Sequence, residues 1–101
     1  MSEHEVVHQP ERQRFVVTAD GADAFVEYRM LAPEVIDFVH TYTPAQLRGR
    51  GLAGELVAYA VNYARQQGWR VIGSCSYVAA WLEKHPAGAR NAAPTGRAAF
   101  R

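Results

Sequence analysis

The first half of the chain contains three segments whose pattern is typical of β-strands. They are rich in β-branched and aromatic residues and lie at residues 14–18, 24–31 and 35–42. Asp20-Gly21 separates the first two segments and favours a tight turn, so we expect a hairpin there. The third segment is the most apolar, which predicts a central position in the sheet.

The pattern then changes to helical spacing. Apolar residues recur every three or four positions from Leu52 to Ala64, which predicts a helix that ends near Gln67. Gly68 fits the left-handed residue that closes a helix. A strand over residues 69–73 and a second helix over residues 77–84, capped by Ser76, complete the prediction.

The order strand, helix, strand in the second half predicts a crossover that leaves its two strands parallel. We therefore expect an α/β (α+β) fold, in which antiparallel N-terminal strands precede a β-α-β-α unit. Its domain covers residues 12–86. We expect residues 1–11 to be a frayed lead-in and residues 87–101 to be a flexible tail, because both are polar or low in complexity.

Composition narrows the classes of function. A chain of 101 residues is one domain, and its net charge of +1 does not favour binding a polyanion through bulk electrostatics. The single cysteine, Cys75, excludes an internal disulfide and argues against a cysteine-rich zinc site. His4 and His8 are four residues apart, a spacing that can bind a metal on a helix, but no third ligand is near and Pro10 breaks the segment. We therefore expect no metal. The chain shows no apolar run that would mark a signal peptide or membrane span, so we expect a cytoplasmic protein.

The stretch Arg48-Gly49-Arg50-Gly51 stands at the start of the predicted long helix. Glycine lets a ligand approach the backbone closely, and the first amides of a helix lack intrahelical partners at the positive end of the helix dipole. Two arginines add positive charge. This combination predicts a site for a phosphate or pyrophosphate group.

Other glycine-rich motifs fit less well. A Walker loop needs Lys and Ser or Thr after its last glycine, whereas Leu52-Ala53 follows Gly51. The Rossmann fingerprint belongs to a dinucleotide-binding half, which the first two strands of this chain do not form. Arg-Gly repeats also occur in disordered RNA-binding segments. Nucleic-acid binding through the arginines of the loop and the tail therefore remains as a weaker hypothesis beside the two given below.

The pattern that does fit is Arg/Gln-x-x-Gly-x-Gly/Ala, matched by residues 48–53. With the stretches at residues 37–42, 74–78 and 82–86, it makes the chain resemble the minimal, single-domain members of the GCN5-related N-acetyltransferase superfamily. The resemblance covers residues 15–86. It implies a sheet in which the two parallel strands splay apart.

The resemblance also implies binding of coenzyme A, with acetyl-CoA as the acyl donor. The pyrophosphate would lie on the loop amides, the pantetheine arm between strands 35–42 and 70–73, and the thioester carbonyl near residues 39–41. The expected coenzyme-binding residues are Val39, Thr41, Tyr42, Arg48, Gly49, Arg50, Gly51, Leu52, Ala53 and Cys75.

Three residues are candidates for catalysis. His40 could accept a proton, as histidine side chains commonly do in enzymes, and Tyr77 could supply one. Cys75 lies just before the last helix, where a thiolate is favoured, and could carry the acetyl group as a thioester. The structural alternatives are a His40 bonded to Asp37 or to the backbone and a Cys75 that only packs.

Two departures from the larger members bear on function. Many of those carry a tyrosine before Glu-Lys in the last helix, whereas Leu82 stands there in this chain. Only residues 20–23 separate the first two strands, so no extra helices wall the acceptor site. We expect an acetyl-CoA-dependent N-acetyltransferase acting on an amine, and the open acceptor site favours an amine on a protein or peptide. The alternative is a coenzyme A-binding module without turnover.

Overall fold

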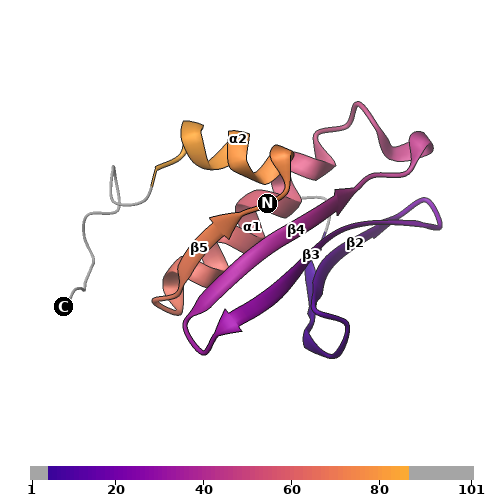
Figure 1. The fold of residues 1–101 in the computed structure, drawn as a ribbon. Coiled ribbons are helices and arrows are strands. Elements are labelled where there is room, and N and C mark those ends of the chain that lie inside the picture. The colour runs from indigo at the N-terminus through magenta and orange to yellow at the C-terminus, as the bar shows by residue number, and fades with distance from the viewer. Residues whose placement is uncertain (1–4, 87–101) are drawn as a thin grey trace.

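One mixed β-sheet organises the molecule, whose computed structural model describes residues 5–86 (Figure 1). The strands are β1 (Val7–Gln9), β2 (Arg14–Ala19), β3 (Ala22–Ala32), β4 (Val35–Tyr42) and β5 (Arg70–Gly73). The helices are α1 (Leu52–Gln66) and α2 (Ser76–Lys84), with single-turn 3₁₀ helices η1 (Pro10–Arg12) and η2 (Ala45–Leu47).

The strands follow one another in the sheet in chain order, β1-β2-β3-β4-β5. The first four pair antiparallel, and β5 pairs parallel to β4 after the crossover through α1. This confirms the predicted fold class. The turn at Asp20-Gly21 joins β2 to β3, and Gly68 closes α1 with a φ of 80°.

The N-terminal segment differs from our expectation. Within residues 1–11, Val7–Gln9 form β1 instead of a frayed lead-in, and they pair with Arg14–Val16 of β2. His8 anchors this strand, because its ring stacks on Phe15 at 4.2 Å and its Nε2 lies 2.6 Å from the Tyr28 hydroxyl. Three residues are too few to show a periodic pattern, so only the fold reveals this strand. The expected tail over residues 87–101 and the side chain of His4 lie outside the described residues.

The core lies between α1 and the face of the sheet that it covers, here called the core face (Figure 1). The fully buried residues of α1 recur at helical spacing and include Leu52, Leu56, Val57, Ala60, Val61 and Ala64. They pack against alternating residues of the strands: Phe15, Val17, Val26, Ile36 and Phe38. Each large apolar side chain buried in this way contributes about 1.5–3 kcal/mol to stability. This core fixes the start of α1 and the end of β4, which together frame the site.

Neither helix within residues 5–86 is long and apolar enough to cross a membrane. The same residues contain no group of three or more His, Cys, Asp or Glu side chains that could hold a metal ion.

Candidate functional site

The two parallel strands separate after a short stretch of pairing. β4 and β5 are in register from Val35 opposite Arg70 to Phe38 opposite Gly73, and a last bond joins the Cys75 amide to the Phe38 carbonyl at 3.0 Å. Beyond it the chain turns into α2, while residues 39–42 continue as a strand paired with β3 alone. Among the described residues, the β5-facing edge of this part of β4 therefore has no backbone partner.

A β-bulge marks the point of separation. Tyr28 pairs with Phe38 but the preceding Glu27 pairs with His40, so Val39 is an extra residue in β4. A bulge reverses which side chains face which side of the sheet. Phe38 and, after the bulge, Thr41 therefore lie on the core face, whereas His40 lies on the opposite face, here called the outer face.

Asp37 holds the end of β5 against β4. Its carboxylate is buried and accepts hydrogen bonds from the Ser74 amide at 3.1 Å and the Ser74 hydroxyl at 2.8 Å. The partner that a buried Asp37 requires is therefore Ser74, and the predicted alternative of an Asp37–His40 bond is not the arrangement found. Asp37 positions the backbone of the two residues that precede α2.

Cys75 occupies the N-cap of α2, one residue before the cap that we predicted at Ser76. Its Sγ lies 3.4 Å from the Thr41 hydroxyl across the gap between the strands. Partial burial by itself raises the pKa of the Cys75 thiol. Hydrogen bonds from the Thr41 side chain, the Val78 and Tyr77 amides and the Thr41 backbone outweigh this effect, so the pKa is below its ordinary value. The thiol is therefore predisposed to ionise.

His40 does not take part in this contact. Its side chain is exposed on the outer face, with its ring centroid 6.2 Å from that of Phe25 and Glu27 as its cross-strand neighbour. Thr41, one residue later, is the side chain of β4 that meets Cys75. Tyr42 also lies on the outer face, 5.4 Å from Phe25 between ring centroids.

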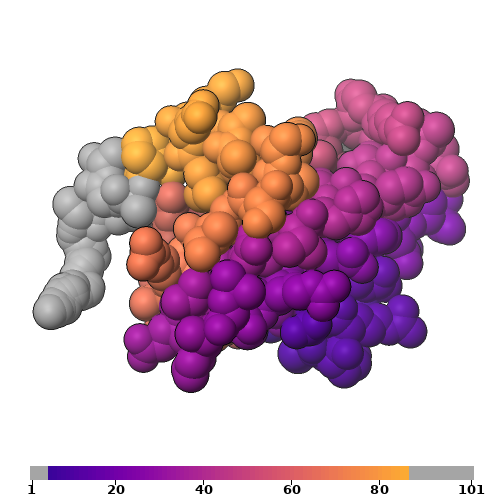
Figure 2. All heavy atoms as spheres, viewed as in Figure 1, coloured from indigo at the N-terminus to yellow at the C-terminus, as the bar shows by residue number. Residues whose placement is uncertain are grey.

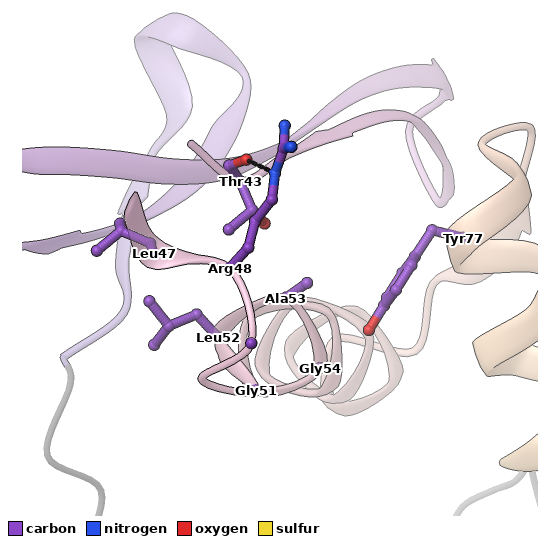
Figure 3. A pocket seen from close by; sticks show the side chains of 9 residues that line it. Thr43, Leu47, Arg48, Gly51, Leu52, Ala53, Gly54 and Tyr77 are labelled. Carbon is purple, nitrogen blue, oxygen red and sulfur yellow. Dashed lines mark hydrogen bonds between the residues drawn. The ribbon is translucent and has the colours of Figure 1, made fainter. Parts of the chain in front are cut away.

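The glycine loop opens a pocket at the start of α1 (Figure 3). Gly49 and Gly51 have φ values of 81° and 77°, which side chains with a Cβ rarely adopt, and Gly51 caps the helix. A Cβ at either position would meet no atom within 4 Å, so these glycines border free space. The pocket has a volume of about 230 Å³ and is lined by Thr43, Leu47, Arg48, Gly49, Gly51, Leu52, Ala53, Gly54 and Tyr77.

The two arginines of the loop have different surroundings. Arg48 lines the pocket, and its Nε donates a hydrogen bond to the Thr43 carbonyl at 2.9 Å. Arg50 instead points to the hairpin between β2 and β3, where its Nη1 lies 2.6 Å from a carboxylate oxygen of Asp20. Of the two charges expected near a phosphate group, only Arg48 belongs to the pocket in this structure.

Tyr77 closes the side of the pocket opposite the loop. Figure 3 shows its ring extending from α2 towards the first turn of α1, and a Cβ added at Gly54 would lie 3.7 Å from the Tyr77 hydroxyl. In the space-filling view, the loop before α1 and the start of α2 rise as two separate lobes beside β4 (Figure 2). The site is thus built between these two segments.

The structure brings most of the predicted residues into two adjoining groups. One is the pocket, and the other is the Thr41–Cys75 contact beside the free edge of β4. Sequence reasoning missed Thr43 and the Asp37–Ser74 pair as parts of the site, and it left Gly54 out of the expected binding residues. Gly54 carried a usable signal, since it follows Gly51 at the spacing that keeps one face of the first helical turn open.

A sequence model of the GCN5-related N-acetyltransferases matches residues 14–91. The chain belongs to this family. A GCN5-like protein from Staphylococcus aureus, described as a candidate N-acetyltransferase, has a solution structure similar to this one. The TM-score is 0.64 and the identity 30%, over 83% of this chain and 82% of the other.

Curated relatives give the same picture at lower identity. Protein NATD1 of Bos taurus is 28% identical over 83 residues, which cover 80% of this chain and 74% of the relative. Protein NATD1 of Homo sapiens is 26% identical over 83 residues, with the same two shares. The family match and the similarity to the solution structure therefore agree with the mixed sheet found in this chain.

Proposed function

We propose that this member of the GCN5-related N-acetyltransferase family transfers an acetyl group from acetyl-CoA to an amine. The observation that supports this most is the junction of two features in one place. An open pocket at the start of α1 adjoins a strand whose edge loses its partner after Phe38, with the Cys75 thiol beside it. Such a junction suits a long ligand with an anionic end and a reactive end.

The pocket fits the diphosphate of coenzyme A in chemistry. The amides of Leu52, Ala53 and Gly54 belong to the first turn of α1, where backbone donors have no intrahelical acceptor. The free space around Gly49 and Gly51 leaves these donors accessible, and Arg48 adds a positive charge. Donors of this kind at the positive end of a helix dipole bind phosphate groups.

The free edge of β4 fits the pantetheine arm. Residues 39–42 remain extended but pair on one side only, so their other side offers backbone donors and acceptors to an added strand. The arm of coenzyme A contains two amides that pair in this way. Acetyl-CoA supplies an activated acetyl group, and its reactive end would lie towards Thr41 and Cys75.

Cys75 is the candidate nucleophile. Its thiolate attacks the acetyl carbon, forms a new sulfur–carbon bond and displaces coenzyme A as a thiolate, which then takes up a proton. The amine attacks the acetyl-cysteine, forms the amide bond, loses one proton and releases the Cys75 thiolate. In the direct alternative, the amine attacks acetyl-CoA itself and Cys75 only lines the site.

Two other residues complete the proposed chemistry. His40 is exposed on the outer face, where it can accept the proton of an amine that approaches from that side. Tyr77 borders the pocket proposed for the diphosphate, so its hydroxyl is placed to donate a hydrogen bond there and not a proton to the departing thiolate. Because a tight turn at Asp20-Gly21 joins β2 to β3, no helix between these strands covers the outer face. This open face favours an amine carried on a protein or peptide.

Calorimetric titration with acetyl-CoA tests the binding step. Gly51→Val places a branched side chain in the pocket and should weaken binding by about tenfold or more, or roughly 1.4 kcal/mol. Gly68→Val is the matched control, because Gly68 closes the other end of α1 with a φ of 80° and also has free space around it. Arg48→Glu should also weaken binding. Absence of heat with the wild-type chain would contradict the proposal, as would equal losses in the two valine variants.

Intact mass spectrometry tests the covalent step. After incubation with acetyl-CoA, the wild-type chain should carry one acetyl group that Cys75→Ser lacks. If Cys75→Ser instead transfers acetyl groups at the wild-type rate, the direct route operates.

A coenzyme A-binding module without turnover is the second candidate function. Leu82 favours it, because this apolar residue lies against Gly73, 3.2 Å from where a Cβ there would lie, and occupies the position of the tyrosine expected in larger members. A scan of amines that measures free thiol separates the two functions. If the chain binds acetyl-CoA but no amine causes release of free coenzyme A thiol, the function is that of a binding module.

A further inference from the structure

An ion pair links the glycine loop to a distant turn. Asp20 lies in the β2–β3 hairpin at a φ of 52°, followed by Gly21 at 75°, and its carboxylate is 2.6 Å from Nη1 of Arg50. Arg50 lies between Gly49 and Gly51, both at positive φ. The ion pair therefore joins two turns with positive φ angles that are 30 residues apart in the sequence.

This ion pair keeps Arg50 away from the pocket that its neighbours line. Gly49 and Gly51 both border the pocket, whereas the guanidinium between them is held by Asp20. The two side chains are 45% and 61% exposed, and exposed pairs of this kind contribute only about 0–1 kcal/mol. The contact can therefore be exchanged for another anion at little cost.

We propose that Asp20 competes with the anionic ligand for Arg50 and thereby sets the affinity of the pocket. In the free protein Asp20 holds the guanidinium, and in the complex the diphosphate of coenzyme A draws it to the pocket. The carboxylate therefore lowers the affinity for coenzyme A, and its removal strengthens binding. This inference depends on the proposed function, since it assumes a phosphate-bearing ligand at the start of α1.

The test is a titration of the full-length chain with coenzyme A by calorimetry at low salt. Asp20→Asn should tighten binding by about two- to fivefold, which is the range expected from one exposed ion pair. Asparagine adopts positive φ readily, so the hairpin should keep its shape. Equal or weaker binding by Asp20→Asn would overturn the inference and assign the ion pair to ordering of the loop instead.

Asp23→Asn is the matched control. Asp23 lies in the same hairpin and carries the same charge, but it contacts the Thr18 hydroxyl at 2.6 Å and Arg14 at 4.0 Å. It should leave the affinity unchanged. A gain in Asp23→Asn equal to that in Asp20→Asn would show a general effect of charge and overturn the inference.

A double-mutant cycle isolates the contact. In an Arg50→Gln background, Asp20→Asn should no longer change the affinity, because the residue that the two anions share is gone. The gain from Asp20→Asn should also shrink as salt is raised, since exposed charges are screened. Failure of the wild-type chain to bind coenzyme A removes the proposed function as well. Binding by the wild type with no response to Asp20→Asn removes only the role of Asp20.

Discussion

The two halves of β4 are built for different purposes. Residues 35–38 have strands on both sides and place Ile36 and Phe38 in the core, at 0% and 1% exposure. Residues 39–42 pair with β3 alone, and Tyr42 is 42% exposed. One strand thus supplies stability at its beginning and an accessible backbone edge at its end. The site therefore depends on where β4 stops pairing with β5 as well as on the side chains that β4 carries.

The bulge at Val39 separates the two halves. Without it, residue 40 would face the core and Thr41 would face away from Cys75, because side chains alternate along a strand. One extra residue therefore places a hydroxyl beside the thiol and a histidine on the outer face. The four predictions below probe the two halves in order of expected effect.

Truncation of an aromatic side chain should affect the first half far more than the second. Phe38→Ala should lower the free energy of unfolding by about 3–5 kcal/mol, because it leaves a cavity in the core. Tyr42→Ala, four residues along the same strand, should cost about 1 kcal/mol or less. Urea unfolding followed by circular dichroism measures both. Similar losses in the two variants would contradict the division of β4.

The join between β4 and β5 should show the next largest effect. Asp37→Ala leaves the amide and hydroxyl of Ser74 without their carboxylate partner and should cost about 1.5–3 kcal/mol. Asp23→Ala, an exposed carboxylate of the β2–β3 hairpin, is the control and should cost less than about 1 kcal/mol. A small loss in Asp37→Ala, measured by the same unfolding assay, would show that β5 is held mainly by its backbone.

Protonation of His8 should destabilise the side of the sheet that supports the first half of β4. Burial lowers the pKa of His8, and the nearby Glu11 opposes this only in part. In the folded chain His8 thus stays neutral to lower pH than in the unfolded chain, where it takes up a proton near pH 6.5. Stability should be complete above that pH and decline as pH falls from about 6.5 to the lower folded pKa.

Thermal unfolding at a series of pH values measures this decline. His8→Phe, which keeps a ring against Phe15, should flatten the dependence over that interval. His40→Gln removes an exposed histidine from the second half of β4 and should leave the dependence in place. If the pH dependence of stability disappears in His40→Gln and persists in His8→Phe, His40 and not His8 is its source.

Thr41 should have the smallest effect, on reactivity without a loss of stability. The hydrogen bond from its hydroxyl helps to lower the pKa of Cys75, so Thr41→Val should raise that pKa. Alkylation by iodoacetamide, which requires the thiolate, should then reach half its maximal rate at higher pH than in the wild type. An unchanged profile would assign the low pKa to the amides of α2 alone.

The sequence predicted the elements whose pattern is local. The range 35–42 of β4 matches the structure, and the helix from the glycine loop to about Gln67 ends one residue earlier, at Gln66. These segments could be predicted because a run of β-branched residues, or a helical spacing of apolar residues, extends over many positions in each. The glycines at 49, 51 and 68 could also be recognised from the sequence, since all three have a positive φ, which glycine adopts most readily.

The features that the sequence did not predict depend on contacts between separate elements and not on a pattern within one element. β1 exists because Val7–Gln9 meet β2, and the bulge at Val39 exists because β3 pairs with β4 in a shifted register. The diversion of Arg50 to Asp20 depends on how the hairpin folds over the loop. The sequence therefore indicated which residues belong to the candidate site, but it did not indicate which of them contact one another.

The crossover that carries the chain from β4 through α1 to β5 has a consequence for folding kinetics. β2, β3 and β4 are joined by short turns, whereas the pairing of Val35 with Arg70 must close a long loop and pay its entropy first. We expect the antiparallel meander to form early and β5 to dock at the end of the reaction. A ligand that needs the gap beside β4 would then recognise the finished fold only, and it would slow unfolding without accelerating refolding.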